Sequence, residues 1–324
     1  MTAEDLWAPF AQKYKIHEES LEYVRLMLAG GVKTYSELGV ENVRKLAESR
    51  SLLLTGQIDF DGEDVEIIVP SPYTSEGIPI SVYKPSSRPD VPAIWVYFHG
   101  GGFVICNRKT HETTAKILAR DSGAIVINVE YRLLPDADAP YAPFEDAEVV
   151  TKWVLENKEI VGGKLNSKVG VGGDSAGGQI AIGVTNEIPN IDFQILIYPL
   201  ADTTLSNESV QEFKKVPGLN EDALKFFYEN SLLHMPDYQT NPRVNGMVRT
   251  NTASSPPALI ILAELDPLVG CGIEYTEKLR AAGVKVQLEI IKEVPHSFFT
   301  LRNVYKTKSP EAYNHIVKYI KQFQ

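Results

Sequence analysis

The sequence predicts an α/β fold, an eight-stranded, mostly parallel sheet flanked by helices. Eight short apolar runs rich in β-branched residues follow one another along the chain, and turn residues separate them. Helix-like segments stand between most of the later runs, and strands that alternate with helices form parallel sheets with right-handed crossovers. The eight runs occupy residues 65–69, 80–83, 93–98, 124–129, 169–171, 193–198, 258–262 and 286–291.

The first two predicted strands differ from the later ones. Residues 65–69 and 80–83 lie close together in the chain and alternate apolar with polar side chains. Such alternation leaves one face of a strand wet, so this pair predicts an antiparallel hairpin or meander. The later runs are apolar almost throughout, as expected for strands that helices cover on both faces.

The helical segments divide the chain into regions. Residues 1–55 are rich in helix formers, with apolar residues three and four positions apart, and they predict an N-terminal helical cap segment. Residues 56–324 carry the strands and form the main domain. Residues 200–257 interrupt its rhythm with a long polar stretch, which we interpret as an insertion that contributes to the cap. The other predicted helices occupy residues 113–121, 145–157, 176–187, 221–232, 274–282 and 310–323.

Composition and charge exclude several classes of protein. With 44% hydrophobic and 23% charged residues, the chain has the composition of an ordinary globular protein with a large core. The net charge of -10 disfavours nucleic acids and anionic membranes as partners, because both require a basic face. The two cysteines, Cys106 and Cys271, have no clustered histidine partners, so no metal site is expected.

The N-terminus and the hydropathy pattern predict where the protein resides. Residues 1–7 lack the basic start and the apolar run of a secretory signal. No uninterrupted apolar stretch approaches the roughly 18 residues that a membrane-spanning helix requires. We therefore expect a cytoplasmic protein without a membrane span.

The most informative segment of the sequence contains Ser175. Gly173 and Gly177 flank it in a Gly-x-Ser-x-Gly pattern, after a predicted buried strand and before a predicted helix. A serine in a sharp strand-to-helix turn needs small neighbours because side chains there would clash, and the turn presents its hydroxyl outward. A plain glycine-rich turn or a phosphate-binding loop is the alternative, but no lysine follows for a P-loop. The pattern therefore predicts a nucleophile.

Backbone donors for an oxyanion are predicted from two segments. Residues 99–102, a histidine and three glycines, directly follow a predicted strand. Amides without side chains approach a developing oxyanion most closely, so the N–H groups of Gly101 and Gly102 are candidates, together with that of Ala176. A flexible turn is the alternative for this segment. We interpret His99 as a structural residue that holds the loop by hydrogen bonds.

A base and an acid complete the chemistry. Enzymes with a nucleophile elbow place these groups in the chain order serine, acid, histidine. Of the six histidines, His296 follows the last predicted strand, whereas the others precede the serine or lie in the insertion or the C-terminal helix. Asp266 follows the strand predicted at 258–262 and is the candidate acid, with Glu264 as the weaker alternative. A carboxylate there would fix the imidazole tautomer and stabilise the imidazolium.

With these residues identified, the chain resembles the hormone-sensitive lipase-like family of α/β-hydrolases, which includes arylacetamide deacetylases and plant carboxylesterases. The resemblance covers about residues 60–324 and rests on the segments 99–103, 130–135, 173–178, 264–268 and 296–298. It implies the α/β-hydrolase fold with a helical cap and with residues 56–324 as the catalytic domain. It also implies a triad of Ser175, Asp266 and His296, and oxyanion donors at Gly101, Gly102 and Ala176.

The activity that the resemblance implies is carboxylic-ester hydrolysis through an acyl-serine intermediate, which needs neither a cofactor nor a metal. Small to medium apolar esters are the expected substrates, because aromatic residues are available for the cap and the pocket rim. Those residues are Trp7, Phe10, Phe103, Phe213, Phe226 and Phe227. Two alternatives stay open: amide hydrolysis, by a deacetylase or formamidase with the same triad, and a non-catalytic ligand receptor, although receptors of this family lose the histidine. A homodimer through the sheet edge near Ile290 is a further expectation.

Overall fold

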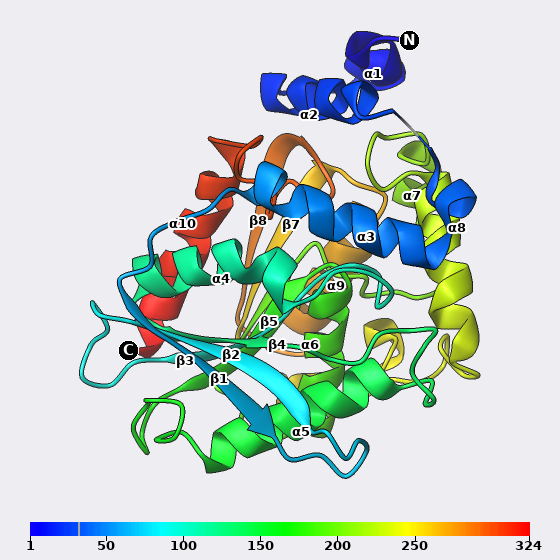
Figure 1. The fold of residues 1–324 in the computed structure, drawn as a ribbon. Helices are drawn as coiled ribbons and strands as arrows, with labels where there is room; N and C mark the ends of the chain where they lie inside the picture. The colour runs from blue at the N-terminus through cyan, green and yellow to red at the C-terminus, as the bar shows by residue number, and fades with distance from the viewer. Residues whose placement is uncertain (32) are drawn as a thin grey trace.

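An eight-stranded sheet forms the centre of the computed structural model, which describes residues 1–31 and 33–324 (Figure 1). The strands are β1 (Gly62–Val69), β2 (Ile78–Pro85), β3 (Ile94–Phe98), β4 (Ile125–Val129), β5 (Val169–Asp174), β6 (Phe193–Ile197), β7 (Ala258–Leu265) and β8 (Val286–Pro295). β1 pairs antiparallel with β2, and β2 pairs antiparallel with β4, while all other neighbours are parallel. The predicted fold class and the eight predicted strands are confirmed.

Helices cover both faces of this sheet. They are α1 (Ala3–Ala11), α2 (Glu18–Ala29), α3 (Tyr35–Thr55), α4 (Arg108–Ser122), α5 (Ala142–Glu156), α6 (Ala176–Glu187), α7 (Glu208–Glu212), α8 (Glu221–Asn230), α9 (Val269–Ala281) and α10 (Lys308–Ile320). Short 3₁₀ segments are Leu232–His234, Gly246–Val248, Thr252–Ser254 and Lys321–Phe323. Successive side chains of a strand point to opposite faces. Accordingly, Val96 of β3 packs in the core with α5, α6 and α9, whereas Trp95 packs in the core with α4 and α10.

The strand order reverses next to β3. Across the sheet the order is β1-β2-β4-β3-β5-β6-β7-β8, so the connection after β3 leads through α4 to one side while β5 lies on the other. Loops that leave neighbouring strands in opposite directions open a crevice at the carboxyl ends, which is where open α/β sheets bind ligands. Residues 99–102 follow β3 and Ser175 follows β5, so the topology brings both segments to this crevice.

The helices described in the N-terminal region are α1, α2 and α3; α1 and α2 lie at the top of the view in Figure 1, and α3 lies below them. The ring of Phe10 in α1 stacks on Phe213, which follows α7, with 6.0 Å between the ring centroids. Tyr35, the first residue of α3, contacts Phe226 of α8 edge to face. Its N–H also donates a 2.9 Å hydrogen bond to Asp222 in the first turn of α8. The N-terminal helices and the inserted segment therefore contact each other directly.

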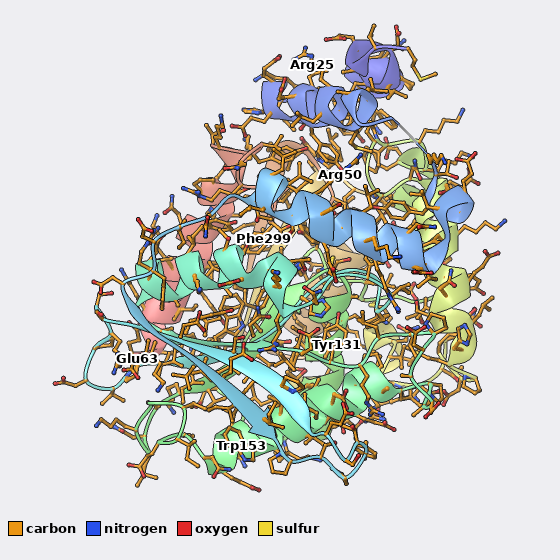
Figure 2. The ribbon with its side chains drawn as sticks, viewed as in Figure 1. Arg25, Arg50, Glu63, Tyr131, Trp153 and Phe299 are labelled. Atoms are coloured by element: carbon orange, nitrogen blue, oxygen red, sulfur yellow. The ribbon has the colours of Figure 1, made fainter. Side chains whose placement is uncertain are left out.

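Side chains fill the space between the sheet and the helices (Figure 2). Phe299 and Tyr131 are buried in the interior, whereas Arg25 and Glu63 lie at the surface. Within residues 1–31 and 33–324, none of the helices combines the length and the apolar character that crossing a bilayer requires.

Four helices begin earlier than the sequence predicts. α4 begins at Arg108 instead of residue 113, and α5 begins at Ala142 instead of residue 145. α9 begins at Val269 instead of residue 274, because packing overrides the low helix propensity of the glycines in its first turns. A Cβ at Gly272 would lie 2.4 Å from a methyl carbon of Leu262, so glycine lets the helix approach β7 without displacement of that side chain. α10 begins at Lys308 instead of residue 310, and the hydroxyl of Ser309 in its first turn donates a 2.7 Å hydrogen bond to the Phe298 carbonyl.

Candidate active site

Ser175 occupies the sharp turn between β5 and α6. Its φ of 55° and ψ of -118° fit neither a helix nor a strand, which is a strained conformation for a residue with a side chain. Its N–H is fixed by a 2.8 Å hydrogen bond to the Ile197 carbonyl at the end of β6. A Cβ at Gly173 or Gly177 would lie 2.0 or 1.9 Å from the Phe98 carbonyl oxygen. The two flanking positions therefore require glycine, as the motif predicted.

Hydrogen bonds connect the three residues that the sequence predicted as a triad. His296 directly follows β8, and its Nε2 lies 2.9 Å from Ser175 Oγ although the two residues are 121 positions apart. Its Nδ1 lies 2.7 Å from Oδ2 of Asp266, which directly follows β7. His296 and Asp266 are 4% and 0% exposed, whereas Ser175 is partly exposed. With Nδ1–H donated to the carboxylate, Nε2 is the acceptor for the serine hydroxyl.

The carboxylate of Asp266 is held in place by its own loop. Its Oδ1 accepts a 2.9 Å hydrogen bond from the backbone N–H of Leu268. Glu264, the alternative acid in the sequence, has other partners, since it accepts hydrogen bonds from Lys292 Nζ at 2.8 Å and from the Glu293 N–H at 2.9 Å. Asp266 is therefore the carboxylate that contacts the imidazole.

The three predicted oxyanion donors come from the loop after β3 and from the first residue of α6. Gly101 and Gly102 have φ angles of 115° and 60°, the region that favours glycine. Among the described residues, no acceptor is bound to the N–H of Gly101 or Gly102. Ala176 is the first residue of α6, so its N–H belongs to the first turn, where N–H groups have no partner within the helix. Gly102, Ala176 and Ser175 line one cavity. Gly101 is the residue before Gly102 and is not among the lining residues.

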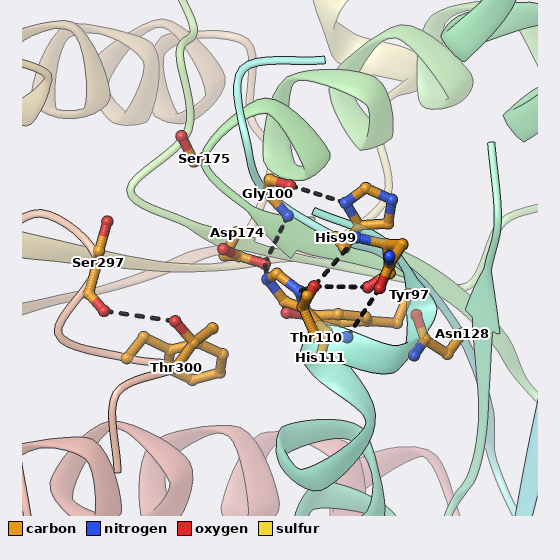
Figure 3. Close-up of polar contacts among 12 residues, drawn as sticks. Tyr97, His99, Gly100, Thr110, His111, Asn128, Asp174, Ser175, Ser297 and Thr300 are labelled. Carbon is orange, nitrogen blue, oxygen red and sulfur yellow. Dashed lines mark hydrogen bonds and ion pairs between the residues drawn. The ribbon is translucent and has the colours of Figure 1, made fainter. Parts of the chain in front are cut away.

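A buried carboxylate, that of Asp174, connects the turn at Ser175 to the glycine loop after β3 (Figure 3). Oδ1 of Asp174 accepts hydrogen bonds from the Tyr97 hydroxyl at 2.5 Å and from the Gly100 N–H at 3.0 Å. The same oxygen lies 3.5 Å from Nε2 of His111. Burial raises the pKa of Asp174, but the charge and hydrogen bond of His111 and the hydrogen bond of Tyr97 outweigh it, so this pKa lies below its ordinary value. An ionised carboxylate next to the nucleophile thus anchors the glycine loop.

His99 holds the same loop from the other side. Its Nδ1 lies 2.7 Å from the Gly100 carbonyl oxygen, and the Tyr131 hydroxyl donates a 2.7 Å hydrogen bond to the His99 carbonyl. Burial, followed by the charge of His111, lowers the pKa of His99 to about 3, so its imidazole is neutral at neutral pH. These contacts agree with the interpretation of His99 as a structural residue.

Four residues of the site were missed by the sequence reasoning. Asp174, Tyr97 and His111 form the network behind the nucleophile, and Tyr198 packs its ring against His296 with 4.3 Å between the centroids. The only signal for them was the position of Asp174 inside the serine motif. The other three have no recognisable spacing, because strand and helix packing alone brings them to the site.

A narrow, mostly apolar cavity adjoins the Ser175 hydroxyl. It contains about 440 Å³ of empty space, part of it open to solvent. The lining residues are Gly102, Phe103, Ser175, Ala176, Gln179, Leu200, Leu205, Leu219, Leu224, Phe227, Tyr228, Ser231, Leu232 and Leu268. Of the aromatic residues expected in the cap and the pocket rim, Phe103 and Phe227 line this cavity. The other aromatic residues expected in the cap and the rim pack in hydrophobic cores that include residues of 1–55 and 200–257: Trp7, Phe10, Phe213 and Phe226.

In residues 1–31 and 33–324 the histidine, cysteine, aspartate and glutamate side chains form no group that could hold a metal ion.

Known proteins resemble this chain over most of its length. The model of a protein family with the description "alpha/beta hydrolase fold" matches residues 95–300 of this chain. Ethyl acetate hydrolase from Pseudomonas putida is 32% identical over 288 residues, which are 85% of this chain and 88% of that protein. Esterase LipI from Mycobacterium tuberculosis is 38% identical over 229 residues, which are 67% of this chain and 69% of that protein.

Solved structures show the same likeness. An ester hydrolase from the metagenome of Lake Arreo, in complex with a bipyridine phosphonate derivative, is 27% identical and has a TM-score of 0.88, over 95% of this chain and 99% of its own. A hyperthermophilic esterase from the archaeon Pyrobaculum calidifontis is 30% identical and has a TM-score of 0.80, over 88% of this chain and 94% of its own. The chain belongs to the alpha/beta hydrolase family, and its resemblance to the hormone-sensitive lipase-like members is confirmed.

Proposed function

We propose that Ser175, His296 and Asp266 form the catalytic triad with which this protein hydrolyses carboxylic esters. The observation that carries the proposal is the pair of hydrogen bonds from His296, 2.9 Å to the serine and 2.7 Å to the aspartate. The ligand receptors of this family lose the histidine, whereas this chain retains His296. The relatives named above are esterases and ester hydrolases, and this protein is likewise a carboxylic-ester hydrolase.

In the first half of the reaction the serine is acylated. Ser175 Oγ attacks the ester carbonyl carbon while His296 Nε2 takes the hydroxyl proton, and the π pair of the carbonyl moves onto its oxygen. The N–H groups of Gly101, Gly102 and Ala176 donate to that oxyanion. As the oxyanion collapses, the bond to the alcohol oxygen breaks, and His296 returns its proton to the leaving alkoxide.

In the second half water releases the acyl group. His296 Nε2 takes a proton from the water as its oxygen attacks the acyl carbon, and a second oxyanion forms at the same donors. Collapse of this intermediate breaks the bond to Ser175 Oγ, which regains its proton from His296. The products are one carboxylic acid and one alcohol, and no cofactor enters the balance. Asp266 holds the imidazole and stabilises its charged form in both halves.

The carboxylate behind the nucleophile is expected to affect the rate. Asp174→Ala should lower kcat for p-nitrophenyl butanoate by about 100-fold, because small displacements of positioned donors cost this much. Without the carboxylate, the Gly100 N–H loses its acceptor and the donor loop can shift. Steady-state kinetics measures the effect, and a thermal melt verifies the fold. The exposed Asp121→Ala is the matched control and should stay within about twofold. An unchanged kcat in folded Asp174→Ala would exclude this positioning role.

The lining of the cavity supports small to medium apolar acyl groups. We also propose that residues 1–55 and 200–257 together form a cap over a catalytic domain of residues 56–324. Phe227 of α8 supports this, since a Cβ at Gly102 would lie 2.2 Å from its ring. The homodimer and the cytoplasmic location stay predictions from the sequence.

A matched panel of esters and amides tests the proposed reaction. p-Nitrophenyl acetate, butanoate and octanoate are compared with the corresponding p-nitroanilides at equal enzyme concentration. We expect ester turnover to exceed amide turnover throughout, because an anilide is a worse leaving group for the same triad. Amide turnover equal to or above ester turnover would identify an amide hydrolase instead.

A further inference from the structure

A second cavity lies beside the one that contains Ser175. The inner cavity contains about 440 Å³ of empty space and the outer about 710 Å³. Residues that line the outer cavity are Thr204, Leu205, Val210, Gln211, Lys214, Glu221, Leu224, Lys225, Tyr228, Tyr238 and Gln239. Three residues, Leu205, Leu224 and Tyr228, line both spaces. These three side chains, the partition wall, therefore separate a narrow apolar space at the nucleophile from a larger, more polar one.

Hydrogen bonds and the helix geometry hold the partition wall in place. Leu224 and Tyr228 lie four positions apart in α8, so both face the same side of the helix. The Tyr228 hydroxyl lies 2.7 Å from the Tyr238 hydroxyl, and the two rings meet edge to face. The Thr203 hydroxyl donates a 2.7 Å hydrogen bond to the Tyr238 carbonyl, which fixes the loop that carries Leu205. Tyr238 thus anchors both the helical and the loop side of the wall.

The reaction determines which part of the substrate meets this wall. In the proposed mechanism the acyl group stays bonded to Ser175 after the alcohol has left, so the narrow apolar cavity at the nucleophile suits the acyl group. Leu224 and Tyr228 line it on the side of the outer cavity, and displacement of the Tyr228 ring would break its hydrogen bond to Tyr238. A chain that fits the inner cavity buries its methylene groups among leucines. A longer chain meets the wall.

We propose that the partition wall sets the length of the acyl chain that this enzyme accepts, and that the outer cavity takes the distal methylene groups of longer chains once the wall is reduced. The proposal rests on the proposed ester hydrolysis at Ser175 and adds its chain-length specificity. The assignment of the inner cavity to the acyl chain makes a distinct prediction for the alcohol part of the ester. The enzyme's preference for alcohols of different length should not change when the partition wall is altered.

The experiment compares kcat/KM for p-nitrophenyl acetate, butanoate, hexanoate, octanoate and decanoate. In Leu224→Ala and in Tyr228→Ala the ratio of octanoate to butanoate should rise at least about tenfold over wild type, because extra methylene groups in an apolar site give discrimination of this order. Leu224→Phe, which enlarges the wall, should lower the ratio of butanoate to acetate. Leu233→Ala is the matched control, since it truncates an exposed leucine that lines neither cavity. Its ratios should equal those of wild type.

Three results would overturn the proposal. In the first, the ratio of kcat/KM for octanoate to that for butanoate is unchanged in both alanine variants, and the ratio of butanoate to acetate is unchanged in Leu224→Phe. The second is an equal rise of the ratio in Leu233→Ala. The third comes from acetate esters of ethanol, butanol and octanol: a shift of their length preference in the alanine variants would place the alcohol in the inner cavity. Wild-type turnover of p-nitrophenyl butanoate is judged separately, because only its absence would count against ester hydrolysis itself.

Discussion

Replacement of Ser175 by alanine should lower kcat for p-nitrophenyl butanoate by about 10⁶-fold, the scale at which loss of a triad serine acts. The physical reason is the loss of the atom that forms the acyl bond, since water at the oxyanion donors is a poor substitute for a positioned alkoxide. Alanine keeps the Cβ of serine, so the strained turn at φ 55° is unchanged and the fold should persist. Burst and steady-state kinetics with the purified variant measure the effect.

Ser297→Ala is the matched control for this substitution. Ser297 also has a positive φ, 70°, and directly follows His296, but the contact drawn for it in Figure 3 is made by its backbone carbonyl. Loss of its hydroxyl should leave kcat within about twofold of wild type. Wild-type rates in a pure, folded Ser175→Ala sample would show that another residue is the nucleophile.

Replacement of Asp266 by asparagine should lower kcat by about 10⁴-fold, as the same change does in other triads. Asparagine has nearly the same shape, and its carbonyl can still accept from the Leu268 N–H. Its amide group, however, donates to Nδ1 of His296, which places the imidazole proton on Nε2. That tautomer cannot accept the proton of Ser175, so the loss falls on kcat more than on KM.

Glu264→Gln serves as the control for the acid. Glu264 binds Lys292 and the Glu293 N–H at the edge of the sheet, and its charge does not contact the imidazole. Its substitution should leave kcat within about twofold of wild type. The assignment of the acid would be reversed if Glu264→Gln lost activity while Asp266→Asn retained it.

The central strands of the sheet could be predicted from the sequence because they are buried on both faces. The run at 93–98 is apolar throughout, and β3 is covered on both faces in the structure. Helix starts were harder, because they depend on contacts that no local pattern contains. The early start of α9 requires Gly272 to pack against Leu262 of β7, a contact that only the folded sheet creates.

The chemical groups of the candidate site could be predicted because each follows a strand end and has a recognisable type. The network around Asp174 could not, since its partner Tyr97 lies 77 positions away and looks like an ordinary strand residue. The contact arises from the parallel pairing of β3 and β5, which places Phe98 opposite Gly173. The partition wall was equally hidden, because Leu205 lies in a polar stretch and the predicted helix at 221–232 did not indicate which face lines the cavity.

Covalent labelling tests the catalytic role of the triad most directly. A fluorophosphonate probe reacts with an activated serine, whose oxygen attacks phosphorus as fluoride leaves, and intact mass spectrometry counts the adducts. We expect one adduct per wild-type chain, located by peptide mapping on Ser175, and none in Ser175→Ala or in His296→Ala. An unlabelled wild-type protein, or an adduct on a different residue, would contradict the triad.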